Sequence, residues 1–221
     1  MSTAVVPVPP STTTTPPPVA GSPPQPTVPP RATPNGITPH RWTISEYREL
    51  YRTGLFNDVK TMLIHGELYV MAMPDPPHDI ALNLTYEFLR TVCPADHYIR
   101  NQQGFDIGTN NDPGPDLAVV PGSIRGATTT PTSAVLIVEV AESTLFKDTT
   151  TKAELYATAG VPEYWVIDLE HRQLIVFRDP QPLPAGLGAT AYKNHFTLGP
   201  TESVSSRLAP GVSVLVSDLL P

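Results

Sequence analysis

The run AVLIVEVA at positions 134–141 constrains the fold most strongly, because it is apolar and rich in β-branched residues apart from one glutamate. A continuous run of this kind is typical of a strand that is buried on both faces of a sheet. Glu139 lies inside it, and a charged glutamate is costly to bury unless it is paired or binds a metal ion. The run therefore predicts a central strand that carries a carboxylate with a special role.

The region before this run predicts a short helix followed by a β-hairpin. The stretch TISEYRELYRTG begins with a cap region at Thr43, carries Glu46 in the next turn and reaches Gly54 as a stop signal. Two β-rich runs over 59–72 are joined by His65-Gly66. Glycine tolerates the positive φ that a tight hairpin turn needs, so this segment is expected to form a two-stranded hairpin.

Two further helices and several strands are expected. The segment 78–92 reads as an amphipathic helix. We expect its core face to carry Ile80, Leu84, Phe88 and Val92 at four-residue spacing, with Ala81 and Leu89 beside them. The segment 148–159 reads as a second helix, ended by Gly160 and Pro162. Strand-like runs lie around 98–107, 117–120, 163–169, 172–179 and 192–198. Together they predict an α/β fold of the mixed α+β type, with a central mixed sheet flanked by helices and an N-terminal β-hairpin region.

Proline usage divides the chain into a tail and one domain. Of the 28 prolines, 13 lie in the first 40 residues, where Arg31 is the only Lys, Arg, Asp or Glu. Such a segment cannot bury enough apolar surface to offset the entropy of ordering. We expect residues 1–38 to form a disordered Pro/Thr-rich tail and residues 39–221 to form the domain.

Composition limits the cellular compartment and the class of protein that are expected for this chain. The single cysteine, Cys93, excludes an intramolecular disulfide framework and fits a reducing compartment. No apolar run approaches the roughly 20 residues of a membrane span, and the N-terminus lacks the basic region of a secretory signal. A cytoplasmic protein without a membrane partner is therefore expected. The net charge of −7 counts against a simple nucleic-acid coat protein but leaves room for an enzyme with a metal-neutralised acidic site.

Asp116 and Glu139 form the candidate metal pair. Asp116 lies in GPDLAVV at the start of a strand, where an aspartate by itself is most often a turn residue. Two carboxylates on neighbouring strands can converge on Mg²⁺, which takes oxygen ligands and leaves room for a substrate phosphate. Two structural readings of Glu139 stay open: an exposed strand end, or a salt bridge to Lys152.

Three other residues join the list of candidates. Lys152 lies one turn into the helix after the Glu139 strand, where its ammonium could contact a metal-bound water or a phosphate, although a solvated lysine is as good a reading. His78 and Glu67 are possible accessory residues, with a cap-region histidine and an edge-strand glutamate as the plainer readings. The sequence contains no Walker-type loop, GxSxG, CxxC or HExxH pattern, which argues against zinc, and it shows no other cofactor-binding motif.

The order of these elements resembles a known family. The block EVAESTLFKDTTTKAELYATAGVPEYWVIDL, preceded by GPDLAVV, by LIHGELYVM and by a helix that opens at His78, is similar to the Uma-type "putative restriction endonucleases" of the PD-(D/E)XK nuclease superfamily. The resemblance covers roughly residues 43–221. It implies a restriction-endonuclease-like core in which Asp116 and Glu139 hold Mg²⁺, with Mn²⁺ as a possible substitute.

The sequence departs from the family pattern at two positions. The superfamily lysine usually lies two residues beyond the acidic residue, where this chain has Ala141. Uma-type proteins carry a lysine on the following helix instead, and Lys152 matches that place, with Asp148 four residues earlier. Family members also commonly carry a glutamate where this chain has Met62.

These observations define the functional hypotheses. The leading one is a Mg²⁺-dependent endodeoxyribonuclease that hydrolyses phosphodiester bonds in DNA, with Asp116, Glu139 and Lys152 as catalytic residues. The alternative is a catalytically inactive nuclease-fold module that binds protein or nucleic acid. A phosphoesterase that acts on RNA or nucleotides would use the same site. DNA is the expected partner, and a homodimer is left open.

Overall fold

A six-stranded mixed sheet forms the centre of the domain in the computed structural model, which describes residues 38–71, 74–184 and 189–221. In spatial order its strands are β3 (His97–Asn101), β4 (Leu117–Pro121), β5 (Leu136–Ala141), β6 (Glu163–Asp168), β7 (Gln173–Pro182) and β8 (Thr190–Leu198). β5 and β6 are parallel, and the other neighbours are antiparallel. The predicted mixed α/β architecture is confirmed, whereas residues 1–37 of the predicted tail lie outside the described residues.

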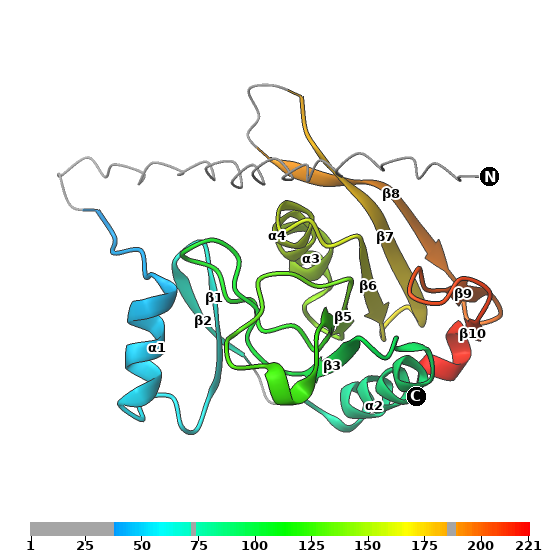
Figure 1. Cartoon of the computed structure of the whole chain (residues 1–221), viewed down its shortest axis with the longest axis horizontal. Coiled ribbons are helices and arrows are strands. Elements are labelled where there is room, and N and C mark those ends of the chain that lie inside the picture. Colours follow the sequence, from blue (N-terminus) through cyan, green and yellow to red (C-terminus); the bar gives the residue numbers. More distant parts are fainter. Residues whose placement is uncertain (1–37, 72–73, 185–188) are drawn as a thin grey trace, which may run out of the picture.

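β5 is the buried central strand that the sequence predicts. All six of its residues are buried, Glu139 included, between β4 on one side and β6 on the other. Figure 1 shows α2 (Pro76–Val92) on one side of β5 and β6, and α4 (Ala153–Thr158) on the other side. Because both faces of the strand are covered, its side chains meet apolar neighbours in both directions, as its composition requires.

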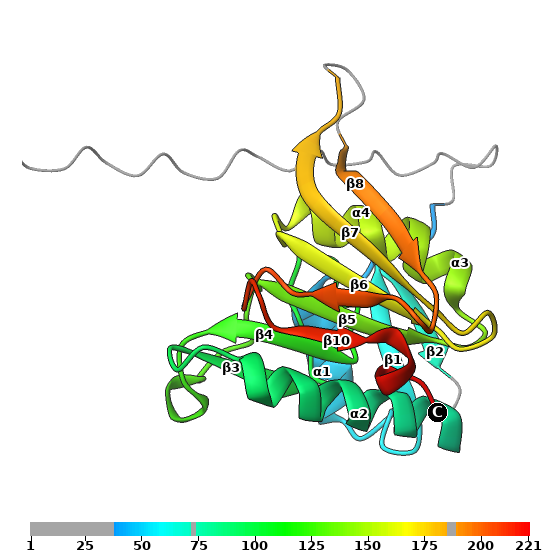
Figure 2. The same cartoon turned by 90° about the vertical axis from the view of Figure 1, so that its right-hand side faces the viewer.

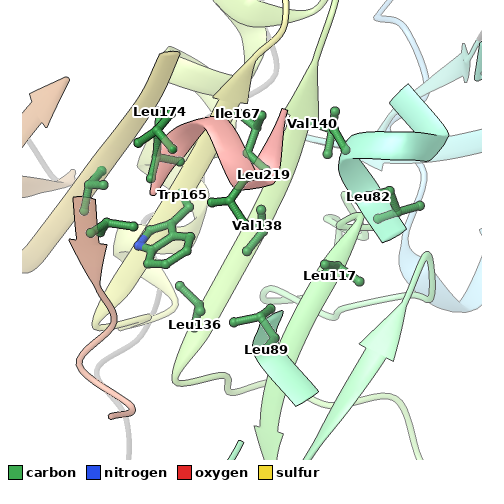
Figure 3. Packing of buried hydrophobic residues seen from close by; sticks show 14 of the residues in the cluster. Leu82, Leu89, Leu117, Leu136, Val138, Val140, Trp165, Ile167, Leu174 and Leu219 are labelled. Atoms are coloured by element: carbon green, nitrogen blue, oxygen red, sulfur yellow. The ribbon is translucent and has the colours of Figure 1, made fainter. Parts of the chain in front are cut away.

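The face of the sheet toward α2 carries the larger apolar cluster. Trp165 and Val138 from the sheet pack with Leu82 and Leu89 of α2 (Figure 3). The C-terminal segment also covers this face, so the end of the chain lies beside α2 (Figure 2). That segment contains β9 (Ser203–Ser205), β10 (Ser213–Leu215) and the 3₁₀ helix η3 (Val216–Leu219); a short 3₁₀ turn, η1 (Ile124–Gly126), follows β4.

The N-terminal helix and hairpin form as expected. α1 (Ile44–Arg52) begins at the Thr43 cap, and Glu46 completes a capping box with it. β1 (Lys60–Ile64) and β2 (Glu67–Met71) are antiparallel and turn at His65 and Gly66, whose φ angles are 52° and 73°. A Cβ on Gly66 would lie 2.9 Å from that of Arg41, so both its backbone angle and its surroundings favour glycine.

The core face of α2 differs from the predicted one. Ile80 and Leu84 are 46% and 39% exposed. The buried residues of this helix are Ala81, Leu82, Thr85, Leu89 and Val92. At 3.6 residues per turn, each step of four residues overshoots a full turn by about 40°, so a strict four-residue series leaves the core face. Steps of three and four in combination keep the buried stripe on one side.

The helix predicted over 148–159 is present, with a π-helical turn inside it. It begins earlier, with α3 (Leu145–Lys147), continues as the π-helix η2 (Asp148–Lys152) and ends as α4. Gly160 follows with a φ of 73°, in keeping with its predicted role as a stop. None of the helices in the described part of the chain is long and apolar enough to span a membrane.

Candidate active site

The structure brings the two predicted carboxylates together where β4 and β5 pair. Leu117 lies opposite Val138 in this antiparallel pair, so the next position along the register places Asp116 beside Glu139. The Val140 backbone N–H donates a hydrogen bond of 2.9 Å to Oδ2 of Asp116. Asp116 is 5% exposed and Glu139 is 3% exposed. Both carboxylates are therefore held almost entirely away from solvent.

Three side chains from other elements surround Asp116. His78 Nε2, at the start of α2, lies 3.3 Å from Oδ2, and the amide of Gln102 donates to Oδ1 at 3.3 Å. Lys60 Nζ, at the start of β1, lies 3.9 Å from Oδ1. Burial by itself raises the pKa of Asp116, but His78 and the Val140 N–H outweigh it and hold that pKa below its ordinary value. Asp116 in turn raises the pKa of His78.

Glu139 is held by the helical segment on the opposite face of the sheet from α2. Lys152 Nζ lies 2.9 Å from its Oε2, and the Tyr156 hydroxyl donates to Oε1 at 2.5 Å. Burial raises the pKa of Glu139 to about 8, and the nearby carboxylates of Asp116 and Asp148 add to the rise against the attraction of Lys152. The salt bridge to Lys152 that the sequence left open is thus present, and it involves the same Glu139 that belongs to the predicted metal pair.

Lys152 is the buried cation of the site. Its ammonium lies 3.0 Å from Oδ1 of Asp148 as well as beside Glu139, and the residue is 3% exposed. Burial by itself lowers the pKa of Lys152, yet Glu139, Asp148 and Asp116 together raise it above the ordinary value. Glu139 and Asp148 therefore share one fully buried ammonium, while Asp116 has His78 and Lys60 beside it.

The hydroxyl of Tyr156 should matter for function although its ring lies in the core. We expect Tyr156→Phe to keep the fold and to lower any activity of the site by about 3- to 10-fold, because a hydrogen bond typically contributes about 0.5–1.5 kcal/mol. Steady-state cleavage rates together with thermal unfolding would measure this. Tyr192→Phe serves as the matched control, because it removes a hydroxyl that bonds the Val161 carbonyl and no other group in the described part of the chain. Equal rates in the two variants would contradict a role for the Tyr156 hydroxyl.

Of the remaining residues that the sequence singled out, only His78 lies at the site, whereas Glu67 and Met62 lie elsewhere. His78 joins the site through Asp116, as described above. Glu67 instead pairs with Arg41 and accepts a hydrogen bond of 2.7 Å from Tyr69, on the exposed part of the hairpin. Met62, which stands where family members commonly carry a glutamate, packs in the apolar cluster that includes residues of α4. This position therefore offers no carboxylate to the site.

Sequence reasoning missed Gln102 and Lys60. Gln102 continues the β3–β4 pairing, in which Asn101 lies opposite Leu117, and its N–H donates to the Asp116 carbonyl at 2.8 Å. The polar run that ends β3 was a usable signal for this residue. Lys60 reaches Asp116 from a separate two-stranded sheet, and no local pattern indicates that contact.

The six-stranded mixed sheet with its flanking helices is a restriction-endonuclease-like fold. The profile of the Uma2 family, described as "Putative restriction endonuclease", matches residues 44–217, and the chain belongs to this family. A solved structure from Anabaena variabilis ATCC 29413, described as "a putative nuclease belonging to DUF820", is similar with a TM-score of 0.62 and 18% identity. The match covers 80% of this chain and 97% of that one, and at this identity it shows a shared fold. A search of curated proteins found no match.

Proposed function

We propose that this chain is a metal-dependent endonuclease that hydrolyses phosphodiester bonds in DNA. The observation that carries the proposal is the placement of Asp116 beside Glu139, with the Lys152 ammonium 2.9 Å from the glutamate. Membership of a family described as restriction endonucleases supports the same reaction class. The arrangement is also the one expected of the PD-(D/E)XK superfamily, to which we assign the chain on this basis.

The residues at this site fit a hard divalent cation. Asp116 and Glu139 offer only oxygen atoms, the donors that Mg²⁺ and Mn²⁺ prefer, and Mg²⁺ needs few protein ligands because it retains water. Burial is the main cause of the raised pKa of Glu139, with Asp116 and Asp148 adding to it, and a bound cation would favour the charged carboxylate. Bound there, Mg²⁺ would supply charge neutralisation at the phosphate and a more acidic water.

The remaining residues would orient the reacting groups. Lys152 places a permanent positive charge beside Glu139, where it can stabilise the negative charge that develops on a phosphate as water adds to phosphorus and an ester oxygen leaves. Tyr156 fixes the orientation of the Glu139 carboxylate, and His78 and Gln102 fix that of Asp116. Burial makes each of these interactions stronger than it would be in water.

The missing lysine at position 141 is compatible with this proposal. Residues two apart in a strand point to the same face of the sheet, so a lysine in place of Ala141 would share the face of Glu139. Lys152 approaches that same face from η2 and supplies the ammonium by another route.

A second candidate function is a non-catalytic binding module. Every oxygen of Asp116 and Glu139 already has a protein donor within 3.3 Å, so the network is complete without a cation. Within the ranges that the structure describes, no group of three or more His, Cys, Asp or Glu side chains is placed to hold a metal ion. This candidate predicts neither cleavage nor metal binding that depends on Glu139.

A panel of substrates decides between these functions. Purified protein is incubated with supercoiled plasmid, linear duplex DNA, single-stranded DNA and RNA, each with Mg²⁺, Mn²⁺ or EDTA. We expect cleavage of DNA with either metal and none with EDTA, since the oxygen donors of Asp116 and Glu139 suit a hard divalent cation. Calorimetric titration with Mn²⁺ runs in parallel. Cleavage of RNA alone would replace DNA as the substrate, and the absence of both cleavage and Mn²⁺ binding would establish the binding module.

A further inference from the structure

Asp148, Lys152 and Tyr156 form a buried stripe on one helical segment. They are spaced four residues apart and are 1%, 3% and 0% exposed. In a regular α-helix two such steps would rotate the stripe by about 80° away from its start, at 3.6 residues per turn. The π-helical turn over Asp148–Lys152 is wider, with i→i+5 hydrogen bonds, so the step from Asp148 to Lys152 does not overshoot a full turn. The Asp148 carboxylate and the Lys152 ammonium lie in contact across this turn.

Asp148 is fixed on three sides. Its Oδ1 lies 3.0 Å from Lys152 Nζ, and its Oδ2 accepts a hydrogen bond of 2.5 Å from the Thr144 hydroxyl. Its backbone carbonyl accepts a bond of 3.0 Å from the Tyr164 hydroxyl of β6. Asp148 therefore has little freedom to move, and its Oδ1 lies in ion-pair contact with the lysine.

The ammonium of Lys152 lies between two carboxylates, at 2.9 Å from Glu139 and 3.0 Å from Asp148. An ammonium that paired with Glu139 alone would compete with a cation for that carboxylate. We propose that Asp148 is a positioning residue: it fixes the Lys152 ammonium beside Glu139 and shares its charge, so that Glu139 stays available to a divalent cation. The part that concerns the cation rests on the proposed function, whereas the hold on the lysine does not.

The hold on the lysine is tested without metal by nitrogen NMR of the lysine ammonium groups. A buried, paired ammonium exchanges its protons slowly and gives a signal, which the loss in Lys152→Met assigns to Lys152. We expect Asp148→Asn to abolish this signal, and Glu154→Gln, an equal charge change at an exposed position of α4, to keep it. Thr144→Val retains the Asp148 charge but removes one of its anchors, so it should weaken the signal. An unchanged signal in both Asp148→Asn and Thr144→Val would overturn the proposal.

The effect on the cation is tested by Mn²⁺ titration of a double-mutant cycle. We expect Asp148→Asn to weaken Mn²⁺ binding by about tenfold, within the usual range of coupling between contacting residues, and to have little effect in a Lys152→Met background. An equal loss in both backgrounds would mean that Asp148 acts on the cation directly, and would overturn the proposal. If the wild-type protein binds no Mn²⁺, the proposed metal site fails instead, and the ammonium signal still decides the role of Asp148. If Asp148→Asn does not fold, Thr144→Val carries both measurements.

Discussion

The Asp116→Asn protein is expected to retain its fold and to lose metal-dependent DNA cleavage by about a thousandfold or more, since a catalytic metal contributes several kcal/mol to the transition state. An asparagine has nearly the same shape as aspartate, and its carbonyl oxygen can still accept the hydrogen bond from the Val140 N–H. It has lost the negative charge, and one of its two oxygens has become an amide nitrogen that cannot bind Mg²⁺. The fold is therefore preserved while the metal pair is broken.

Cleavage of supercoiled plasmid, measured under single-turnover conditions with Mg²⁺, gives the rate, and thermal unfolding checks the fold. Asp96→Asn is the matched control, because it makes the same change at an exposed carboxylate whose partner is His97. We expect that control to cleave at the wild-type rate. A rate for Asp116→Asn within about tenfold of wild type would show that Asp116 is no essential metal ligand.

Local sequence patterns were enough to predict much of the fold. The composition of β5 was enough to predict a strand covered on both faces, because apolar and β-branched residues without alternation fit no other strand environment. His65-Gly66 predicted the hairpin, because its turn demands positive φ. The pairing of Asp116 with Glu139 followed from a charged residue in an apolar strand, with the family resemblance as a second and independent support.

Features that depend on distant parts of the chain could not be predicted in this way. Lys60 reaches Asp116 from β1, in a separate sheet, and no spacing in the sequence encodes that contact. The π-helical turn begins at Asp148, whose carbonyl bonds the Tyr164 hydroxyl of β6, and this tertiary contact leaves no local signal in the sequence. Ile80 shows the same limit, since a periodic pattern defines an apolar face without saying which part of it the sheet covers.

Lys152→Met is the second change with a large expected effect. The variant leaves Glu139 and Asp148 buried without a shared cation, and breaking a buried ion pair by removing one partner typically costs about 3–5 kcal/mol of unfolding free energy. DNA cleavage should fall as well, because the charge that would stabilise the transferring phosphate is gone. We expect loss of both stability and activity, with the loss of stability dependent on pH.

The sign of the pH dependence follows from Glu139. Its pKa rises from the ordinary 4.5 to about 8 on folding, so between these values the folded protein keeps a proton that the unfolded chain releases. The contribution of Glu139 to the free energy of unfolding is fully present below pH 4.5 and is lost as the pH rises to about 8. Lys152 opposes the rise, so its removal raises the pKa of Glu139 further and extends the loss to higher pH. The wild-type lysine stays charged across this window, since its own pKa is raised above its ordinary value.

The free energy of unfolding that Lys152→Met loses relative to wild type should therefore be larger at about pH 9 than at about pH 5. Only at the higher pH are both Glu139 and Asp148 charged in the folded wild-type protein, so that both pair with the lysine. Urea unfolding of both proteins in EDTA at the two pH values measures it. Lys193→Met, which removes a lysine from the exposed middle of β8, controls for the loss of one positive charge. A deficit that is equal at both pH values would contradict the coupling of Lys152 to Glu139. Wild-type cleavage by Lys152→Met, in turn, would remove the lysine from the proposed reaction.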